Sequence, residues 1–183
     1  MALLPINSQR HLHSSKVSDV HILIATDAQW VLDEIQAVLG SPSTTVQVVS
    51  NGRLVAPAVA ERTPDIAILD LQIGSMGGMA VTMDLRLDHS SGALPHVPVL
   101  MLLDRVADVH LARRSGADGW IIKPLDALRL RKAVNAIVAG GCYAEGIPTD
   151  DIEDEEPVVE EAVTEASVAE ETGAESAAEL LNQ

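Results

Sequence analysis

Four charged residues follow apolar runs of the kind that form strands, and their side chains suit phosphate chemistry. Asp27 comes after "VHILIAT", Asp70 after "IAIL", Asp104 after "VPVLMLL", and Lys123 after "GWII". Because the carboxyl ends of parallel strands meet at one edge of a sheet, we expect these side chains to converge. Carboxylates favour a divalent cation such as Mg²⁺, and a nearby ammonium group favours an anion. The set therefore suits transfer of a phosphoryl group to an aspartate.

The elements that must position these residues alternate between strand and helix. Strands are predicted at residues 20–25, 43–50, 66–69, 97–103 and 118–124. Helices are predicted at residues 28–39, 53–63, 76–87, 104–115 and 125–139. Strands that are apolar at nearly every residue suit a parallel sheet covered on both faces. With right-handed crossovers, the pattern predicts an α/β fold, a doubly wound three-layer sandwich with a five-stranded parallel sheet.

Charge divides the chain into unlike parts. From Pro148 to Gln183 there are 13 acidic residues and no basic one, whereas residues 1–147 hold 14 acidic and 12 basic residues. We expect a disordered leader at 1–18, a folded domain at 19–141 and an acidic disordered tail at 142–183. This distribution disfavours nucleic-acid binding, which relies on clustered Lys and Arg.

The expected location is the cytoplasm. The chain has one cysteine, Cys142, which excludes an internal disulfide framework and fits a reducing compartment. Its first residues do not have the pattern of a secretory signal. Since no apolar run approaches the roughly 18 residues that span a bilayer, we expect no membrane insertion.

Three segments, "PDIAILDLQIGSMGG", "VPVLMLLD" and "GADGWIIKP", together resemble the receiver domain of two-component response regulators. The resemblance implies a flavodoxin-like, receiver-type fold. It implies that Asp70 is the phosphoacceptor and that Lys123 contacts the phosphoryl group. It further implies that Mg²⁺ is held by Asp27, Asp70 and the backbone carbonyl of Gln72.

The resemblance covers residues 19–139 and implies further features of the domain. The Lys123–Pro124 peptide bond is expected to be cis, and Trp120 occupies the position of the family's switch aromatic. The signalling surface, which is also a candidate dimerisation surface, is expected at residues 104–139.

The chain departs from the family's pattern around the expected site. Thr26 stands where the acidic pair has a second carboxylate, so we expect weakened Mg²⁺ binding. Leu103 replaces the Ser or Thr that hydrogen-bonds the phosphoryl group, and leucine cannot donate that bond. The next residue, Asp104, is an acid where a small residue is usual. Gly74 replaces a loop proline, which predicts a looser loop.

Two functions remain open. The first is a stand-alone response regulator of a phosphorelay: Asp70 receives a phosphoryl group from a histidine kinase or phosphotransfer protein, and a downstream protein target receives the signal. The stand-alone expectation comes from the lack of a second folded domain after Gly141. The alternative is a pseudo-receiver, a protein–protein interaction module that works without phosphate. Neither is an enzyme.

Two other classes on similar sheets fit the sequence poorly. A haloacid-dehalogenase-like phosphatase needs a second aspartate at position 72, which is Gln. A flavodoxin-like carrier needs a phosphate-binding loop after the first strand, and "ATDAQW" does not provide one.

Overall fold

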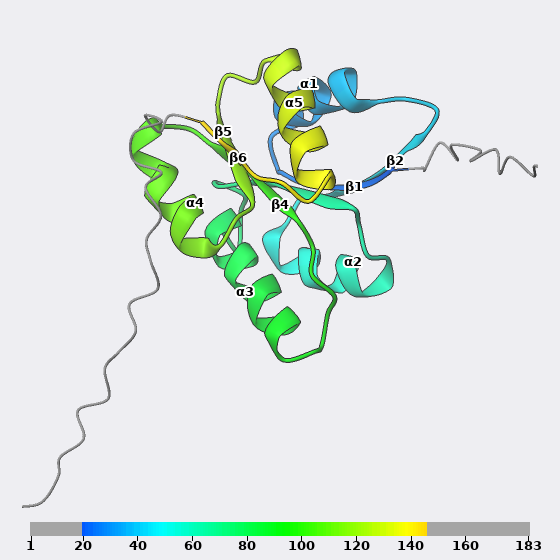
Figure 1. The fold of residues 1–183 in the computed structure, drawn as a ribbon, viewed down its shortest axis with the longest axis vertical. Coiled ribbons are helices and arrows are strands. Elements are labelled where there is room, and N and C mark those ends of the chain that lie inside the picture. Colours follow the sequence, from blue (N-terminus) through cyan, green and yellow to red (C-terminus); the bar gives the residue numbers. More distant parts are fainter. Residues whose placement is uncertain (1–19, 146–183) are drawn as a thin grey trace, which may run out of the picture. The chain divides into compact units, whose positions relative to one another are not determined.

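The structure is a computed structural model that describes residues 20–145. The predicted leader and the tail beyond residue 145 lie outside these residues. Within them, six parallel strands form one sheet in the order β2-β1-β3-β4-β5-β6 (Figure 1). The strands are β1 (Val20–Ala25), β2 (Thr44–Val49), β3 (Ile66–Asp70), β4 (Val99–Leu103), β5 (Gly119–Ile122) and β6 (Tyr143–Ala144).

Five α-helices connect the first five strands and follow the fifth. They are α1 (Gln29–Leu39), α2 (Val55–Glu61), α3 (Gly78–Ser90), α4 (Val109–Ser115) and α5 (Ala127–Val138). Short 3-10 turns at Gly52–Leu54 and Val106–Asp108 precede α2 and α4. Helices α1 and α5 lie on one side of the sheet, and α2, α3 and α4 lie on the other (Figure 1). The predicted three-layer α/β fold is confirmed.

Alternate side chains of the central strands point to opposite faces of the sheet, and both faces are apolar and covered by helices. In β1, Ile22 and Ile24 belong to the core beneath α1 and α5, whereas Leu23 and Ala25 face the opposite core. Strand β3 repeats this arrangement, because alternate side chains of a strand point to opposite faces. All five residues of β3 and of β4 are buried. The carboxyl end of β3, which carries Asp70, is therefore packed against the core on both faces of the sheet.

The structure extends the sheet beyond the five strands predicted from the sequence. Tyr143 and Ala144, which the sequence analysis assigned to the tail, pair with Gly119 and Trp120 of β5. Two residues between a Gly-Gly pair and an acidic stretch have no recognisable strand pattern, which explains why β6 was not predicted.

The helices also begin later than predicted after β3 and β4. The loop after β3 runs to Gly77, and a 3-10 turn takes the first residues assigned to the helix after β4. Trp30, in the first turn of α1, is 53% exposed. No helix within residues 20–145 has the length and hydropathy needed to cross a membrane.

Candidate functional site

Asp70 is the centre of the site and lies at the carboxyl end of β3. Its side chain is only 3% exposed. One carboxylate oxygen, Oδ1, accepts hydrogen bonds from Lys123 Nζ at 2.8 Å and from the backbone N–H of Gln72 at 3.2 Å. The other, Oδ2, accepts from Thr26 Oγ1 at 3.1 Å. Both carboxylate oxygens of Asp70 thus have hydrogen-bond partners, and these partners offset the free-energy cost of burying its charge.

Thr26 links the ends of β1 and β3. Its hydroxyl donates to Asp70 and accepts from the backbone N–H of Ala28 at 3.2 Å. A second carboxylate at this position would repel Asp70, whereas the hydroxyl neutralises no charge and donates a hydrogen bond. Thr26 therefore donates a hydrogen bond to the Asp70 carboxylate. It does not supply the second negative charge that a carboxylate would offer to a bound cation.

Asp27 is exposed and contacts the loop that follows Asp70. Its Oδ2 accepts a hydrogen bond from Gly74 N at 3.0 Å. Proline, the family's usual residue at position 74, has no N–H and cannot make this bond. The expectation of a looser loop stays a prediction, and the Gly74 N–H gives this loop one contact with Asp27.

Two other glycines allow the loop after β3 to pack closely. A Cβ on Gly52 would lie 1.8 Å from the carbonyl oxygen of Met76, and a Cβ on Gly78 would lie 2.6 Å from that of Asp70. Only glycine permits these approaches without movement of the backbone. The loop between β3 and α3 therefore packs through close backbone contacts at Gly52 and Gly78.

Lys123 connects three elements at the edge of the sheet. Besides Asp70, its ammonium group donates to Asp104 Oδ1 at 3.1 Å and lies 5.7 Å from the centre of the Trp30 ring. Its backbone N–H donates to the carbonyl of Leu103 at 2.7 Å, and the Lys123–Pro124 bond is cis, as the resemblance implied. The side chain is 9% exposed, so its charge is poorly screened by water.

Asp104 lies beside a second ion pair in the same loop. Arg105 donates to both carboxylate oxygens of Asp108, and the side-chain hydrogen bonds and charge of Asp108 raise the pKa of Arg105 above its usual value. Arg105 is therefore protonated at any physiological pH. It gives Asp108 a bidentate partner at the start of α4.

The two residues at switch positions lie in the core and not among the charged groups. Leu103 and Trp120 belong to one buried cluster with Leu71, Met101 and Ala112. Trp120 is 7% exposed, and its indole Nε1–H donates to the backbone carbonyl of Glu145 at 2.8 Å. The hydroxyl that the family places at position 103 has no equivalent in this cluster.

Oxygen ligands for a divalent cation at this site come from side chains and from the backbone. Within residues 20–145 there is no group of three or more His, Cys, Asp or Glu side chains placed to hold a metal ion. The predicted set of two carboxylates, Asp27 and Asp70, and the carbonyl of Gln72 consists of oxygen atoms, as Mg²⁺ prefers, with waters completing the shell. The donor chemistry fits Mg²⁺, with fewer acidic ligands than a paired site provides.

Several residues near the site were not predicted. Trp30 lies in the first turn of α1, shortly after the carboxyl end of β1, and the centre of its ring is 5.7 Å from the Lys123 ammonium group. Glu145 accepts from the backbone N–H of Ile122, the neighbour of Lys123, and Arg129 donates to the carbonyl of Pro124. Nothing in the local pattern marked Glu145, because it directly follows a strand that was itself not predicted.

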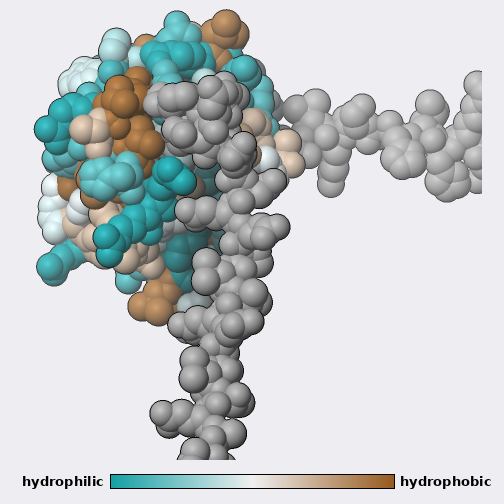
Figure 2. All heavy atoms as spheres, turned by 60° about the vertical axis from the view of Figure 1, so that its left-hand side comes forward, coloured by the Kyte–Doolittle hydropathy of each residue, from teal (hydrophilic) through white to brown (hydrophobic). Residues whose placement is uncertain are grey.

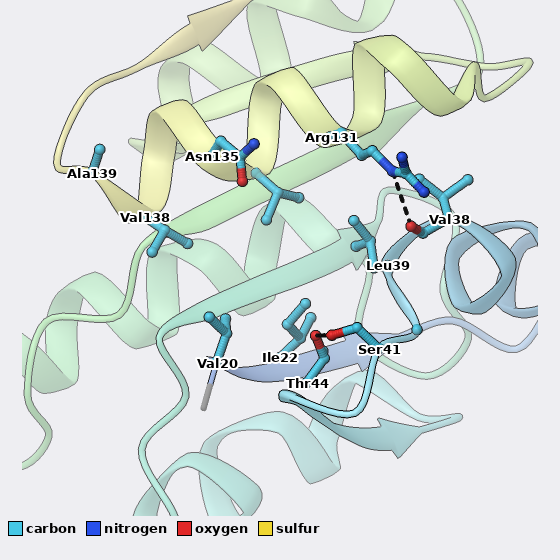
Figure 3. A pocket seen from close by; sticks show the side chains of 12 residues that line it. Val20, Ile22, Val38, Leu39, Ser41, Thr44, Arg131, Asn135, Val138 and Ala139 are labelled. Atoms are coloured by element: carbon cyan, nitrogen blue, oxygen red, sulfur yellow. Dashed lines mark hydrogen bonds between the residues drawn. The ribbon is translucent and has the colours of Figure 1, made fainter. Parts of the chain in front are cut away.

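Figure 3 shows a cavity of about 440 Å³. Its lining includes the beginnings of β1 and β2, whereas Asp70 lies at the carboxyl end of β3. The cavity is formed between the C-terminal halves of α1 and α5 and the beginnings of β1 and β2. Val20, Ile22, Leu39 and Val138 line it, and Arg131 bridges its edge by donating to the carbonyl of Val38. The cavity therefore shares no residue with the charged cluster.

Solved structures show the same fold. The receiver domain of sensor histidine kinase PA1611 from Pseudomonas aeruginosa, which holds a magnesium ion in its active-site cleft, matches with a TM-score of 0.59 and 18% identity, covering 67% of this chain and 99% of that chain. The chemotaxis response regulator CheY4 of Vibrio cholerae matches with a TM-score of 0.58 and 20% identity, covering 66% of this chain and 99% of CheY4. At these identities the likeness concerns the fold.

Sequence comparisons point the same way. The chain is 28% identical to the protein PilH of Pseudomonas aeruginosa over 119 residues, which are 65% of this chain and 98% of PilH. It is 34% identical to the DNA-binding response regulator MtrA of Mycobacterium tuberculosis over 117 residues, which are 63% of this chain and 49% of MtrA. The match thus spans about half the length of MtrA. The family model for the response regulator receiver domain matches residues 22–135.

Proposed function

This chain belongs to the response regulator receiver family, and we propose that it receives a phosphoryl group on Asp70 and signals through protein contacts. The observation that carries the proposal is the Asp70–Lys123 pair at 2.8 Å, at the carboxyl end of the central strands. The donor is a histidine kinase or phosphotransfer protein, and the receiver of the signal is another protein. We place this function in the cytoplasm and assign the chain no enzymatic turnover, no nucleic-acid binding and no membrane insertion.

The residues have distinct roles in the proposed reaction. An Asp70 carboxylate oxygen forms a bond to phosphorus while the phosphorus–nitrogen bond of the donor's phosphohistidine breaks, and the imidazole leaves. Lys123 neutralises charge on the transferred group, because its ammonium already contacts Asp70. Thr26 holds the second Asp70 oxygen in place during the attack.

Mg²⁺ belongs to the proposed site. Asp27, Asp70 and the carbonyl of Gln72 would hold it, and when bound it supplies positive charge that offsets the negative charge of the phosphoryl oxygens. We infer weaker binding than at a site with paired carboxylates, because Thr26 contributes no charge. The bond from Gly74 keeps Asp27 in place for this role.

Three large apolar side chains are exposed after the carboxyl ends of strands. Trp30, Val106 and Leu128 are 53%, 61% and 77% exposed, and each lies just after the carboxyl end of a strand. Figure 2 shows apolar side chains on one face of the molecule as separate patches among hydrophilic ones. These exposed side chains would be available to a partner protein, although exposed apolar residues that stand singly are common on protein surfaces.

The Asp104 contact favours the second candidate, a phosphate-independent pseudo-receiver. Asp104 places a carboxylate on the Lys123 ammonium, which a phosphoryl group would otherwise contact. Leu103 offers that group no hydrogen bond. In this second function the Lys123–Asp104 pair takes the place of the phosphate contact, and the partner binds the chain as it is.

The experiment that separates the two functions uses a small phosphodonor. The wild type and Asp70→Asn are incubated with acetyl phosphate and Mg²⁺, and their intact masses are measured. We expect one phosphoryl adduct on the wild type and none on Asp70→Asn, because asparagine is not a nucleophile here. Absence of an adduct on both proteins, with partner binding unaffected by Asp70→Asn, would establish the pseudo-receiver instead.

A further inference from the structure

The backbone on both sides of Lys123 is held by one ion pair. The N–H of Ile122 donates to Glu145 Oε2 at 3.0 Å. The carbonyl of Pro124 accepts from the Arg129 guanidinium at 2.7 Å. Arg129 and Glu145 also pair with each other through the guanidinium and the second carboxylate oxygen. The Glu145–Arg129 pair therefore encloses residues 122–124, with Lys123 in the middle.

Strand β6 brings Glu145 to this position. Tyr143 and Ala144 are in register with Gly119 and Trp120, and the carbonyl of Glu145 accepts the Trp120 indole N–H at 2.8 Å. A Cβ on Gly119 would lie 2.6 Å from the carbonyl oxygen of Tyr143, so a glycine in β5 makes room for β6. The backbone carbonyl and both carboxylate oxygens of Glu145 thus each have a partner, and the pairing of β6 with β5 holds the two residues before it.

The Glu145–Arg129 pair is partly buried, so water screens its attraction less than that of a fully exposed ion pair. The side chains of Arg129 and Glu145 are 35% and 21% exposed. The guanidinium is planar and presents several donors at once, so it binds Glu145 and Pro124 in one fixed geometry. Lysine, in contrast, has a flexible stem, and the position of its ammonium depends on how well its backbone is fixed.

We propose that Glu145 and Arg129 are positioning residues that hold Lys123 against Asp70. The proposal rests on the proposed function for its link to phosphoryl transfer, while the placement of Lys123 is independent of it. Loss of Glu145 frees the Ile122 N–H and leaves Arg129 without its carboxylate. The Lys123 ammonium then departs from its place beside Asp70, and the rate of phosphoryl transfer falls, because small displacements of a catalytic group are costly.

The first test measures the accessibility of the Lys123 amine in the full chain. Wild type, Glu145→Ala, Glu145→Gln and Arg129→Ala are treated briefly with formaldehyde and dimethylamine–borane, and methylation is quantified by peptide mass. Lys132, exposed on α5, is the internal reference. Glu61→Ala, which removes an exposed carboxylate at the end of α2, is the matched control. We expect the Lys123 to Lys132 ratio to rise about threefold or more in the two alanine variants.

Glu145→Gln distinguishes the complete pair from a single hydrogen bond. Glutamine keeps an oxygen that accepts from Ile122 but loses the charge that pairs with Arg129, so we expect a ratio between those of the wild type and Glu145→Ala. A ratio in Glu145→Ala equal to that of the wild type and Glu61→Ala would overturn the proposal. A rise at Lys132 as well as Lys123, with loss of the thermal transition, would show general unfolding and would also count against it.

The second test measures the reaction. With acetyl phosphate and Mg²⁺, we expect Glu145→Ala to accumulate the Asp70 adduct at least threefold more slowly than wild type and Glu61→Ala. An unchanged rate despite raised Lys123 methylation would refute the claim that the pair serves phosphoryl transfer. If wild type forms no adduct, the proposed function fails, and the methylation ratio still decides whether Glu145 and Arg129 position Lys123.

Discussion

At the scale of single residues, the site depends on a charge balance around a buried carboxylate. Asp70 has one cationic partner, Lys123, and two neutral donors, the Thr26 hydroxyl and the Gln72 N–H. A buried ion pair that loses one member leaves an uncompensated charge, which costs more than the pair contributes. Lys123 is therefore important for the stability of the fold as well as for the proposed chemistry.

Replacement of Lys123 by methionine tests this balance. We expect Lys123→Met to lower the free energy of unfolding by about 3 kcal/mol at neutral pH, because the ionised Asp70 is left buried without a cation. Urea denaturation measures the loss. The same change at exposed Lys132 should alter stability by less than about 0.5 kcal/mol.

A second substitution identifies the cause of that loss. Asp70→Asn in the Lys123→Met background removes the orphaned charge, so we expect it to recover at least half of the lost stability. Failure of this double variant to recover any stability would mean that Lys123 acts through packing of its stem instead.

Residue types and their positions at strand ends predicted the charged side chains of the site, but not its backbone contact through Gly74 or the exposed Trp30 ring. The positions of Asp27, Asp70 and Lys123 at strand ends were sufficient to predict that they share an edge. The role of Gly74 was not predictable, because Gly74 acts through its backbone N–H, which donates to Asp27 in a different loop. Trp30 was not predicted at the site, since an aromatic residue at helical spacing is equally consistent with a core position and with a rim position.

At the scale of elements, the hydrogen bonds of one arginine add to the apolar packing of α3 against the sheet. Arg86 donates to the carbonyls of Gly116 and Val97 and to the carboxylate of Asp118, at 2.7–2.9 Å. The same Asp118 oxygen accepts the Val99 N–H, at the beginning of β4. The network therefore connects α3 with the beginnings of β4 and β5, at the opposite end of these strands from the site.

Removal of the guanidinium should weaken this connection. We expect Arg86→Met to lower the free energy of unfolding by about 2 kcal/mol, because several charge-assisted hydrogen bonds are lost and Asp118 remains partly buried. Chemical denaturation followed by circular dichroism measures it. Arg113→Met, at an exposed position of α4, is the control, and an equal effect of both changes would contradict the assigned role of Arg86.

Elements differed in how well their sequences predicted them. Strands β3 and β4 were evident because they are apolar at nearly every residue and buried on both faces. Strand β6 was missed because two residues have too short a pattern to show a period. Its pairing depends on Gly119, whose missing side chain is informative only once the neighbouring strand is known.

At the scale of the whole molecule, charge is the dominant feature. The chain has a net charge of −15, and 13 of its 27 acidic residues follow position 147. A large negative charge makes the electrostatic potential around the chain more negative, which repels approaching anions, and salt reduces this effect. The acidity therefore bears on how fast an anionic phosphodonor reaches Asp70.

The salt dependence of phosphorylation is the corresponding prediction. For the full chain, we expect the rate of adduct formation with acetyl phosphate to rise about twofold between low and high ionic strength. A chain that ends at residue 147 carries 14 acidic and 12 basic residues and should show a smaller change. Equal salt responses of the two chains would show that the acidic segment has no influence on the site.

Trp30 gives the molecule a property separate from its signalling. The chain contains two tryptophans, one tyrosine and no phenylalanine. One indole is exposed and lies 5.7 Å from the Lys123 ammonium, whereas the other is buried against Met101 and Leu103. Because indole emission depends on nearby charge and on contact with water, the chain carries its own fluorescent reporter at the edge of the site. In a Trp120→Phe background, the light emitted by Trp30 alone would follow events at Lys123 without any attached dye.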